Sequence, residues 1–175
     1  GEKKRVSIAV GLINTPKVLF LDEPTTGLDP HLRISVLNFL LKINKEMNTT
    51  MVIVSHDLEV ADYCSRVAIL NFGKIEGFGK PKELVESLPS NGKMIIAMFK
   101  ELDNRVAIPA IMRIKDVVYV LNAGRNKLKI FIENIDEANV VIKKIKALGF
   151  EVVKFIIDSS SFLEYFRIKG KHIID

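Results

Sequence analysis

The sequence predicts an α/β protein in two parts, and three observations lead to this prediction. In residues 1–88, short apolar runs alternate with helical patterns, which is the order that produces a mostly parallel sheet. Residues 89–175 follow the order strand, helix, strand, strand, helix, strand, which is the order of small α+β domains called ferredoxin-like. Between the two patterns, residues 88–92 combine Leu, Pro, Ser, Asn and Gly, and this composition indicates a linker.

The first part begins with a helix predicted over residues 2–14. Residues 18–21 form an apolar run that is typical of a buried strand. Asp29 is a good helix N-cap and Pro30 suits the first helical position, so a second helix is expected from there to about Met47. The other elements predicted in this part are a strand over 50–54, a short helix over 58–64, strands over 67–70 and 74–78, and a helix over 81–88.

The second part contains two predicted helices between its strands and one at its end. Pro109 is expected to interrupt the first of them. Asp136 and Glu137 in the first turn and Gly149 after the last apolar residue mark the second. The predicted elements are a strand over 94–99, a helix over 102–114, strands over 117–121 and 128–132, a helix ending at 149, a strand over 152–157 and a helix over 162–169.

Composition excludes some classes of protein. No apolar run approaches the roughly 20 residues that span a bilayer. Cys64 is the one cysteine, which excludes an internal disulfide and a thiolate metal cage. The net charge of +5 comes from residues 89–175, but the lysines near 143–146 fit the solvated face and last turn of a helix. We therefore expect no nucleic-acid partner.

Two adjacent carboxylates, Asp22 and Glu23, follow the apolar run directly. The carboxyl end of a strand is where open α/β sheets place their ligands. Burying an acidic pair is costly unless a cation or hydrogen-bond donors compensate. The pair therefore suggests metal and water chemistry, although a surface or helix-capping pair would have the same sequence.

Three segments in order resemble motifs of ABC-type ATPases, the ATP-hydrolysing subunits of ABC transporters. Residues 18–30, Val-Leu-Phe-Leu-Asp-Glu-Pro-Thr-Thr-Gly-Leu-Asp-Pro, resemble the Walker B motif and the D-loop. Residues 1–6 resemble the tail of the family's signature sequence from its last glycine, and residues 52–57 resemble its switch-histidine strand. The resemblance covers about residues 1–84 and implies a P-loop NTPase-type sheet in a domain that we place at residues 1–88.

The resemblance implies roles for three residues at the strand ends. Asp22 would hold Mg²⁺ through a bound water, and Glu23 would orient or polarise the water that attacks the γ-phosphate of ATP. His56 would contact the γ-phosphate and link it to Glu23. By itself a histidine after a strand is more often structural, and the spacing of the three motifs is what favours a catalytic role here.

The resemblance also implies contacts across a head-to-tail dimer. Gly1 would present its N–H to the nucleotide of the opposite subunit, and Glu2 follows it in the signature. Asp29 belongs to the D-loop, which crosses the dimer interface in the family, although its role as a helix cap would suffice to explain it. The expected ligands are thus ATP and Mg²⁺.

The phosphate-holding Walker A motif, Gly-x-x-x-x-Gly-Lys-Ser/Thr, is missing from the sequence. In the motif, backbone N–H groups, the lysine and the hydroxyl hold the phosphates. The Gly-Lys pairs of this chain begin at residues 73, 79, 92 and 170, and Ser or Thr follows none of them. In the family this loop precedes the signature, so we expect the chain to be a C-terminal fragment that is inactive alone.

Residues 89–175 resemble, more loosely, the small C-terminal domain of ATPase subunits of daunorubicin-resistance-type drug exporters. Residues 161–166 are similar to the Ser-Leu-Glu-Asp-x-Phe ending of that family, with Ser161 and Phe166 matching it in type. The resemblance implies an exporter ATPase at the cytoplasmic face of the cell membrane, with a second ATPase subunit and a transmembrane permease as partners. The alternatives are a non-transport ABC-type ATPase, or a regulatory or dimerisation module in residues 93–175.

Overall fold

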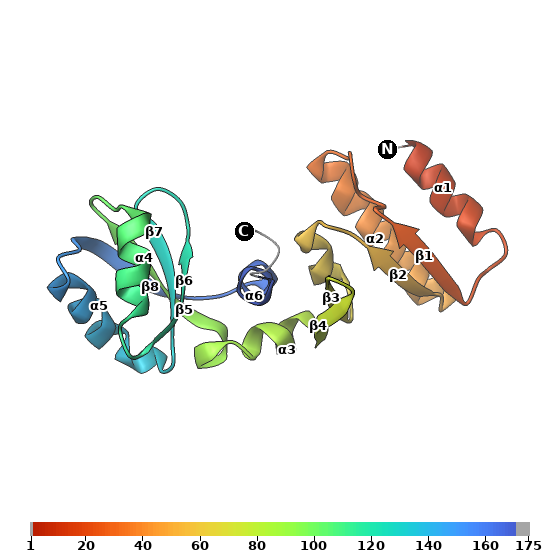
Figure 1. Ribbon diagram of the computed structural model, residues 1–175. Coiled ribbons are helices and arrows are strands. Elements are labelled where there is room, and N and C mark those ends of the chain that lie inside the picture. The colour runs from red at the N-terminus through yellow and green to blue at the C-terminus, as the bar shows by residue number, and fades with distance from the viewer. Residues whose placement is uncertain (1, 171–175) are drawn as a thin grey trace. The chain divides into compact units, whose positions relative to one another are not determined.

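The computed structural model describes the backbone of residues 2–170 and the side chains of residues 6–170 (Figure 1). Its contacts divide the chain into two compact units, Gly1–Ser65 and Arg66–Asp175. The predicted boundary between residues 88 and 89 lies inside the second unit, and the division into an ATPase-type domain and an accessory domain stays a prediction. No helix in the described part of the chain has the length and apolar character to cross a membrane.

The first unit has two parallel strands and their helices. The elements are α1 (Glu2–Leu12), β1 (Val18–Asp22), α2 (Pro30–Met47), β2 (Thr50–Val54) and the 3₁₀ helix η1 (Leu58–Tyr63). β1 pairs in parallel with β2, so that Asp22 lies opposite Val54. Asp29 caps α2 as predicted, because its Oδ1 accepts a hydrogen bond from the Leu32 N–H at 3.0 Å.

One face of this strand pair packs on a small apolar core, whose members are Ile8, Leu21, Leu28, Val36 and Leu40. The alternation of side chains along a strand places the remaining residues on the other face. That other face is open, and Phe20 on it is 74% exposed. The strand pair therefore has one face packed on the core and one open face. Because β1 and β2 are parallel, their carboxyl ends, Asp22 and Val54, lie side by side at one edge.

The second unit begins with an antiparallel hairpin of β3 (Val67–Asn71) and β4 (Lys74–Gly79). The prediction of a mostly parallel sheet is wrong for this segment. The turn between the strands is too short for the crossover that parallel pairing needs, so the chain can only turn back. In the described residues, β1 with β2 is the single parallel pair.

The helix α3 (Pro81–Glu86) and the 3₁₀ turn η2 (Pro89–Gly92) follow the hairpin. The predicted linker over residues 88–92 packs against the unit rather than crossing solvent. The Ser90 hydroxyl donates to the Ile132 carbonyl at 2.8 Å, and the Ser160 hydroxyl donates to the Gly92 carbonyl at 2.6 Å. These bonds satisfy polar groups that a buried turn would otherwise leave unpaired.

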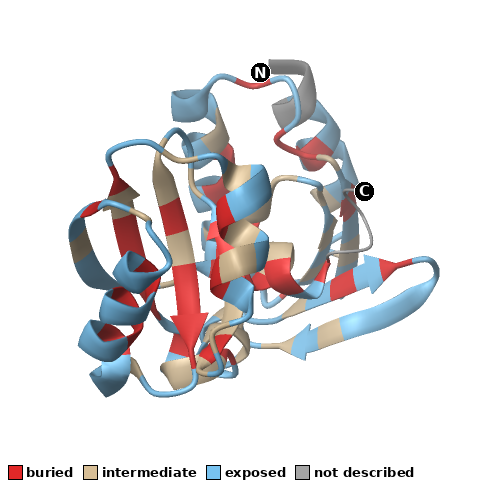
Figure 2. Cartoon of the chain, turned by 60° about the vertical axis from the view of Figure 1, so that its left-hand side comes forward, coloured by how far each residue is buried: buried red, intermediate tan, exposed pale blue. Residues whose placement is uncertain are grey.

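The rest of the second unit has a four-stranded antiparallel sheet in the order β6-β7-β5-β8. The predicted strand and helix order is present, and buried residues are frequent along β5, β6 and β7 (Figure 2), whereas Val152 is the one buried residue of β8. The elements are β5 (Lys93–Phe99), α4 (Asn104–Met112), β6 (Val117–Asn122), β7 (Lys127–Ile132), η3 (Ile135–Glu137), α5 (Ala138–Ala147), β8 (Val152–Ser159) and α6 (Phe162–Lys169).

Two details differ from the predicted helices. Pro109 lies inside α4 without interrupting it, and both Pro109 and Arg105 are exposed, so water can solvate the carbonyl that the proline leaves unbonded. Asp136 and Glu137 lie in η3 rather than in α5, because the Asn134 side chain caps the 3₁₀ turn at the Asp136 N–H.

The helix α6 is held to the sheet by a buried ion pair. Ser161 and Glu164 form a capping box at its start, in which Glu164 accepts from both the N–H and the hydroxyl of Ser161. The other oxygen of Glu164 lies 2.5 Å from Nζ of Lys129 on β7, and the Glu164 side chain is 3% exposed. The short helix thus gains an anchor that its length alone does not provide.

Candidate functional site

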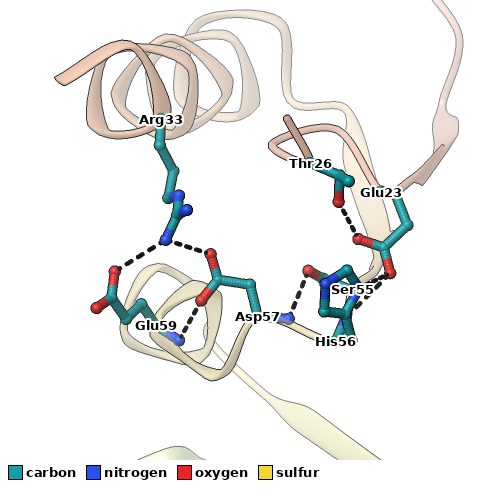
Figure 3. Close-up of polar contacts among 7 residues, drawn as sticks. All are labelled: Glu23, Thr26, Arg33, Ser55, His56, Asp57 and Glu59. Carbon is teal, nitrogen blue, oxygen red and sulfur yellow. Dashed lines mark hydrogen bonds and ion pairs between the residues drawn. The ribbon is translucent and has the colours of Figure 1, made fainter. Parts of the chain in front are cut away.

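The end of the β1–β2 pair brings together side chains that are far apart in sequence. The Glu23 N–H donates to the Val54 carbonyl at 2.9 Å, which continues the pairing one residue beyond β1. His56 follows β2 at the same edge (Figure 3). The parallel register therefore decides that Glu23 and His56 meet.

The backbone of Glu23 turns sharply at this point. Its φ angle is +47°, in the left-handed region that residues other than glycine seldom occupy. The chain then folds back, and the Thr26 N–H donates to the Glu23 carbonyl at 3.3 Å. Such conformations cost of order 1–3 kcal/mol and persist where the surrounding contacts enforce them.

The Glu23 carboxylate is bonded at both oxygens. Oε1 lies 2.7 Å from Nδ1 of His56 and accepts a hydrogen bond from the His56 main-chain N–H at 3.1 Å. Oε2 accepts a hydrogen bond from the Thr26 hydroxyl at 2.6 Å. The Thr26 hydroxyl first, and the His56 contacts next, lower the pKa of Glu23 from 4.5 to about 2. At neutral pH the carboxylate is therefore ionised and can only accept hydrogen bonds.

Asp22 is exposed at the end of β1 and lines a hollow of about 470 Å³ beside α1. Among the side chains that the structure describes, no group of three His, Cys, Asp or Glu residues could hold a metal ion. Mg²⁺ is usually bound through one or two carboxylates together with substrate phosphates. The single carboxylate of Asp22 thus fits an ion that arrives with a phosphate ligand better than a resident metal.

A second polar cluster supports the segment after His56 (Figure 3). The Asp57 carboxylate accepts from the Glu59 N–H at 3.1 Å, which caps η1, and its other oxygen lies 2.8 Å from Nη1 of Arg33. Ser55 Oγ accepts from the Asp57 N–H at 3.0 Å. These contacts tie the segment that carries His56 to α2.

The structure places most, but not all, of the predicted site residues. It brings Glu23 and His56 together, with Asp22 next to Glu23, and it gives Asp29 the role of helix cap. Gly1 lies outside the described residues. Glu2 begins α1, and its side chain lies outside the described part as well.

Sequence reasoning missed Thr26 and Arg33. A hydroxyl three residues after a carboxylate, in a Pro-Thr-Thr-Gly turn, is the signal that could have indicated Thr26, since such turns bring residues i and i+3 together. Arg33 has no comparable local signal, because its partners are on a different element.

Comparisons with known proteins show similarity to ATP-binding subunits of transporters. No protein-family model matches the chain. It is 31% identical over 191 residues to the methionine import ATP-binding protein MetN of Staphylococcus saprophyticus, an alignment that covers 99% of this chain and 56% of that protein. It is 34% identical over 139 residues to the energy-coupling factor transporter ATP-binding protein EcfA2 of Clostridium perfringens, covering 73% of this chain and 48% of that protein.

A solved structure, cbiO1 from Clostridium perfringens, part of an ABC transporter complex, is 40% identical over 49% of this chain and 35% of that chain, with a TM-score of 0.47. The chain spans about half the length of the curated relatives named above. By its similarity to these two curated proteins, the chain resembles the ATP-binding subunits of ABC transporters.

Proposed function

We propose that this chain belongs to an ABC-transporter ATP-binding subunit, whose complete form hydrolyses ATP to power transport. The observation that carries the proposal is the contact between Glu23 and His56 at the ends of two neighbouring parallel strands. Similarity to the ATP-binding proteins of two transporters supports it.

In this proposal Glu23 positions the attacking water. Phosphoryl transfer depends mainly on positioning and electrostatics, and an ionised carboxylate can accept a hydrogen bond from the water and take up its proton. The low pKa of Glu23, about 2, keeps it ionised but makes it a weak base. Its main contribution is therefore orientation of the water.

His56 links Glu23 to the phosphate. An ionised carboxylate cannot donate, so the proton of the contact between the two side chains belongs to Nδ1 of His56. In neutral His56, Nε2 is then an acceptor and cannot donate to a phosphate. Donation from Nε2 to the γ-phosphate therefore requires that both ring nitrogens of His56 carry a proton while it contacts ATP.

Asp22 is the residue that would hold Mg²⁺, through a bound water, when the ion arrives with ATP. The ion supplies charge neutralisation at the phosphate oxygens when bound. Glu23 and His56 act on the water and the phosphate from the neighbouring strand ends.

The remaining roles concern the dimer. Gly1 and Glu2, in the signature tail, would contact the nucleotide of the opposite subunit, and Asp29 would lie at the subunit interface while capping α2. A transmembrane permease would be the second partner, with the subunit at the inner face of the membrane. We assign residues 1–88 to the ATPase-type domain and residues 89–175 to a ferredoxin-like accessory domain.

We propose export as the direction of transport, because residues 161–166 resemble the ending of drug-exporter ATPases. Import is the second candidate, because the relative aligned with 99% of this chain is named as a methionine import protein. Uptake of labelled methionine by cells, dependent on this subunit and abolished by Glu23→Gln, would favour import.

The test of the proposal is ATP hydrolysis by the complete subunit. We expect Glu23→Gln and His56→Ala each to lower kcat by about 10²- to 10⁴-fold, since each removes a group that acts on the water or the phosphate. His31→Ala is the matched control, because His31 is exposed and belongs to no motif. Wild-type rates in both site variants would contradict the proposal.

The 175-residue chain alone should not hydrolyse ATP, because it contains no Walker A sequence to hold the phosphates. Magnesium-dependent turnover by this chain that Glu23→Gln abolishes would show that the missing motif is dispensable.

A further inference from the structure

The carboxylate of Glu23 is held from two sides. His56 contacts Oε1, while Oε2 accepts the Thr26 hydroxyl at 2.6 Å. A glutamate side chain has several rotatable bonds, and ordering it costs conformational entropy. The two His56 contacts both meet Oε1 and so hold one end of the carboxylate, whereas the Thr26 contact at Oε2 holds the other end and limits rotation of the carboxylate plane.

The backbone of the turn places Thr26 where it can make this contact. Glu23 has a φ angle of +47° and its carbonyl accepts the Thr26 N–H at 3.3 Å. Pro24 between them restricts its own φ angle and is buried. The β-branched threonine has few χ1 rotamers, so the turn delivers its hydroxyl to Oε2 with little freedom.

We propose that Thr26 is a positioning residue, whose hydroxyl fixes the plane of the Glu23 carboxylate so that Oε1 meets His56. In this proposal Thr26 acts through Glu23 rather than on the attacking water or the phosphate. The relevance of Thr26 to ATP hydrolysis rests on the proposed function. The effect of Thr26 on the position of the Glu23 carboxylate does not, and it can be measured in this chain alone.

The neighbouring residue is a matched control. Thr25 is 1% exposed, and its hydroxyl has no hydrogen-bond partner among the described residues. Thr26→Val and Thr25→Val are the same chemical change at adjacent positions, yet only the first removes a bond to Glu23. Thr26→Ser keeps a hydroxyl and is the conservative rescue.

The first experiment measures amide hydrogen exchange by NMR in the 175-residue chain. The His56 N–H donates to Oε1 of Glu23, so its exchange rate reports on how firmly the carboxylate is held. We expect Thr26→Val, and Thr26→Ala as a second variant, to raise this rate by about tenfold, the equivalent of one hydrogen bond. Thr26→Ser and Thr25→Val should stay within about twofold of wild type.

Exchange of the α2 amides monitors the fold in each variant. An unchanged His56 exchange rate in Thr26→Val would overturn the proposal. An equal increase of the His56 exchange rate in Thr25→Val would also overturn the proposal, since it would indicate that either substitution loosens the turn after Glu23 in a general way.

The second experiment measures ATP hydrolysis by the complete subunit. Thr26→Val should lower kcat about tenfold with little change in KM, because Thr26 itself is not proposed to contact ATP, and Thr26→Ser should restore kcat. Wild-type kcat in Thr26→Val would overturn the proposal while leaving the ATPase assignment intact. A wild-type subunit without ATPase activity would instead contradict the proposed function, and the exchange result would still decide the role of Thr26.

Discussion

Glu23 and His56 are 33 residues apart in the sequence, and Oε1 of Glu23 lies 2.7 Å from Nδ1 of His56. The parallel pairing of β1 with β2 produces this proximity, since Asp22 and Val54 are opposite each other, Glu23 directly follows Asp22, and His56 is the second residue after Val54. Thr26 completes the arrangement at the other carboxylate oxygen.

The first prediction concerns the pH dependence of this contact. The pKa of Glu23 is about 2 in the folded chain, below its ordinary 4.5, because Thr26 and His56 stabilise the ionised form. The contribution of these contacts to stability is therefore fully present above pH 4.5 and is lost as the pH falls through about 2. An NMR titration of the Glu23 carboxyl carbon should give a midpoint near 2, which Thr26→Val raises. A wild-type midpoint at 4.5 or above would show that the contacts do not form in solution.

The tautomer of His56 is a second measurable consequence. Because ionised Glu23 only accepts, neutral His56 should carry its proton on Nδ1. Nitrogen-15 NMR of the ring distinguishes the two tautomers, and Glu23→Gln should weaken the preference. A ring protonated mainly on Nε2 in the wild-type chain is incompatible with the described contact.

Thr25 should be replaceable by valine without loss of stability. Its buried hydroxyl lacks a partner among the described residues, and an unsatisfied buried polar group costs about 1–3 kcal/mol. We expect Thr25→Val, which keeps the shape, to leave the free energy of unfolding unchanged or to raise it by about 1 kcal/mol, measured by urea denaturation. A loss of about 2 kcal/mol or more would mean that the hydroxyl has a partner in solution.

Lys129 should contribute more to stability than a comparable surface lysine. Removing its Nζ leaves the Glu164 carboxylate, 3% exposed, without its cation, and breaking such a buried pair costs about 3 kcal/mol. We expect this loss for Lys129→Met in urea denaturation, with partial recovery when Glu164→Gln is added.

Lys80→Met is the matched control, because the Lys80–Glu83 pair is 63% and 60% exposed and such pairs contribute about 0.2–1 kcal/mol. Equal losses for the two lysines would show that burial of Glu164 does not matter.

Gly77 on β4 should tolerate alanine only when Tyr165 is shortened. A Cβ at Gly77 would lie 2.9 Å from the Tyr165 hydroxyl oxygen, and Tyr165 is 4% exposed and cannot move freely. Gly77→Ala should cost about 1–3 kcal/mol of unfolding free energy, and much less in a Tyr165→Phe background, where the next ring atom is 3.5 Å away. The same cost in both backgrounds would exclude this close approach as the cause.

Local patterns in the sequence determined which elements form in this protein. The helix beginning at Pro30, the strand over Thr50–Val54 and the helix over Phe162–Lys169 were predictable, because caps and the period of apolar residues act within a few positions. The acidic pair at a strand end was visible for the same reason. The predicted interruption at Pro109 was wrong because Pro109 and Arg105 are exposed. Water can therefore bond the carbonyl that the proline leaves without a helical partner, and the helix continues.

Only the tertiary structure decided which of these elements meet. The order β6-β7-β5-β8, the packing of the predicted linker by Ser90 and the pairing of Lys129 with Glu164 all join residues far apart along the chain. At the site, the sequence indicated Glu23 and His56 but not Thr26, whose hydroxyl depends on a backbone turn. Such contacts depend on strand register and backbone angles, which no short-range pattern of residues specifies.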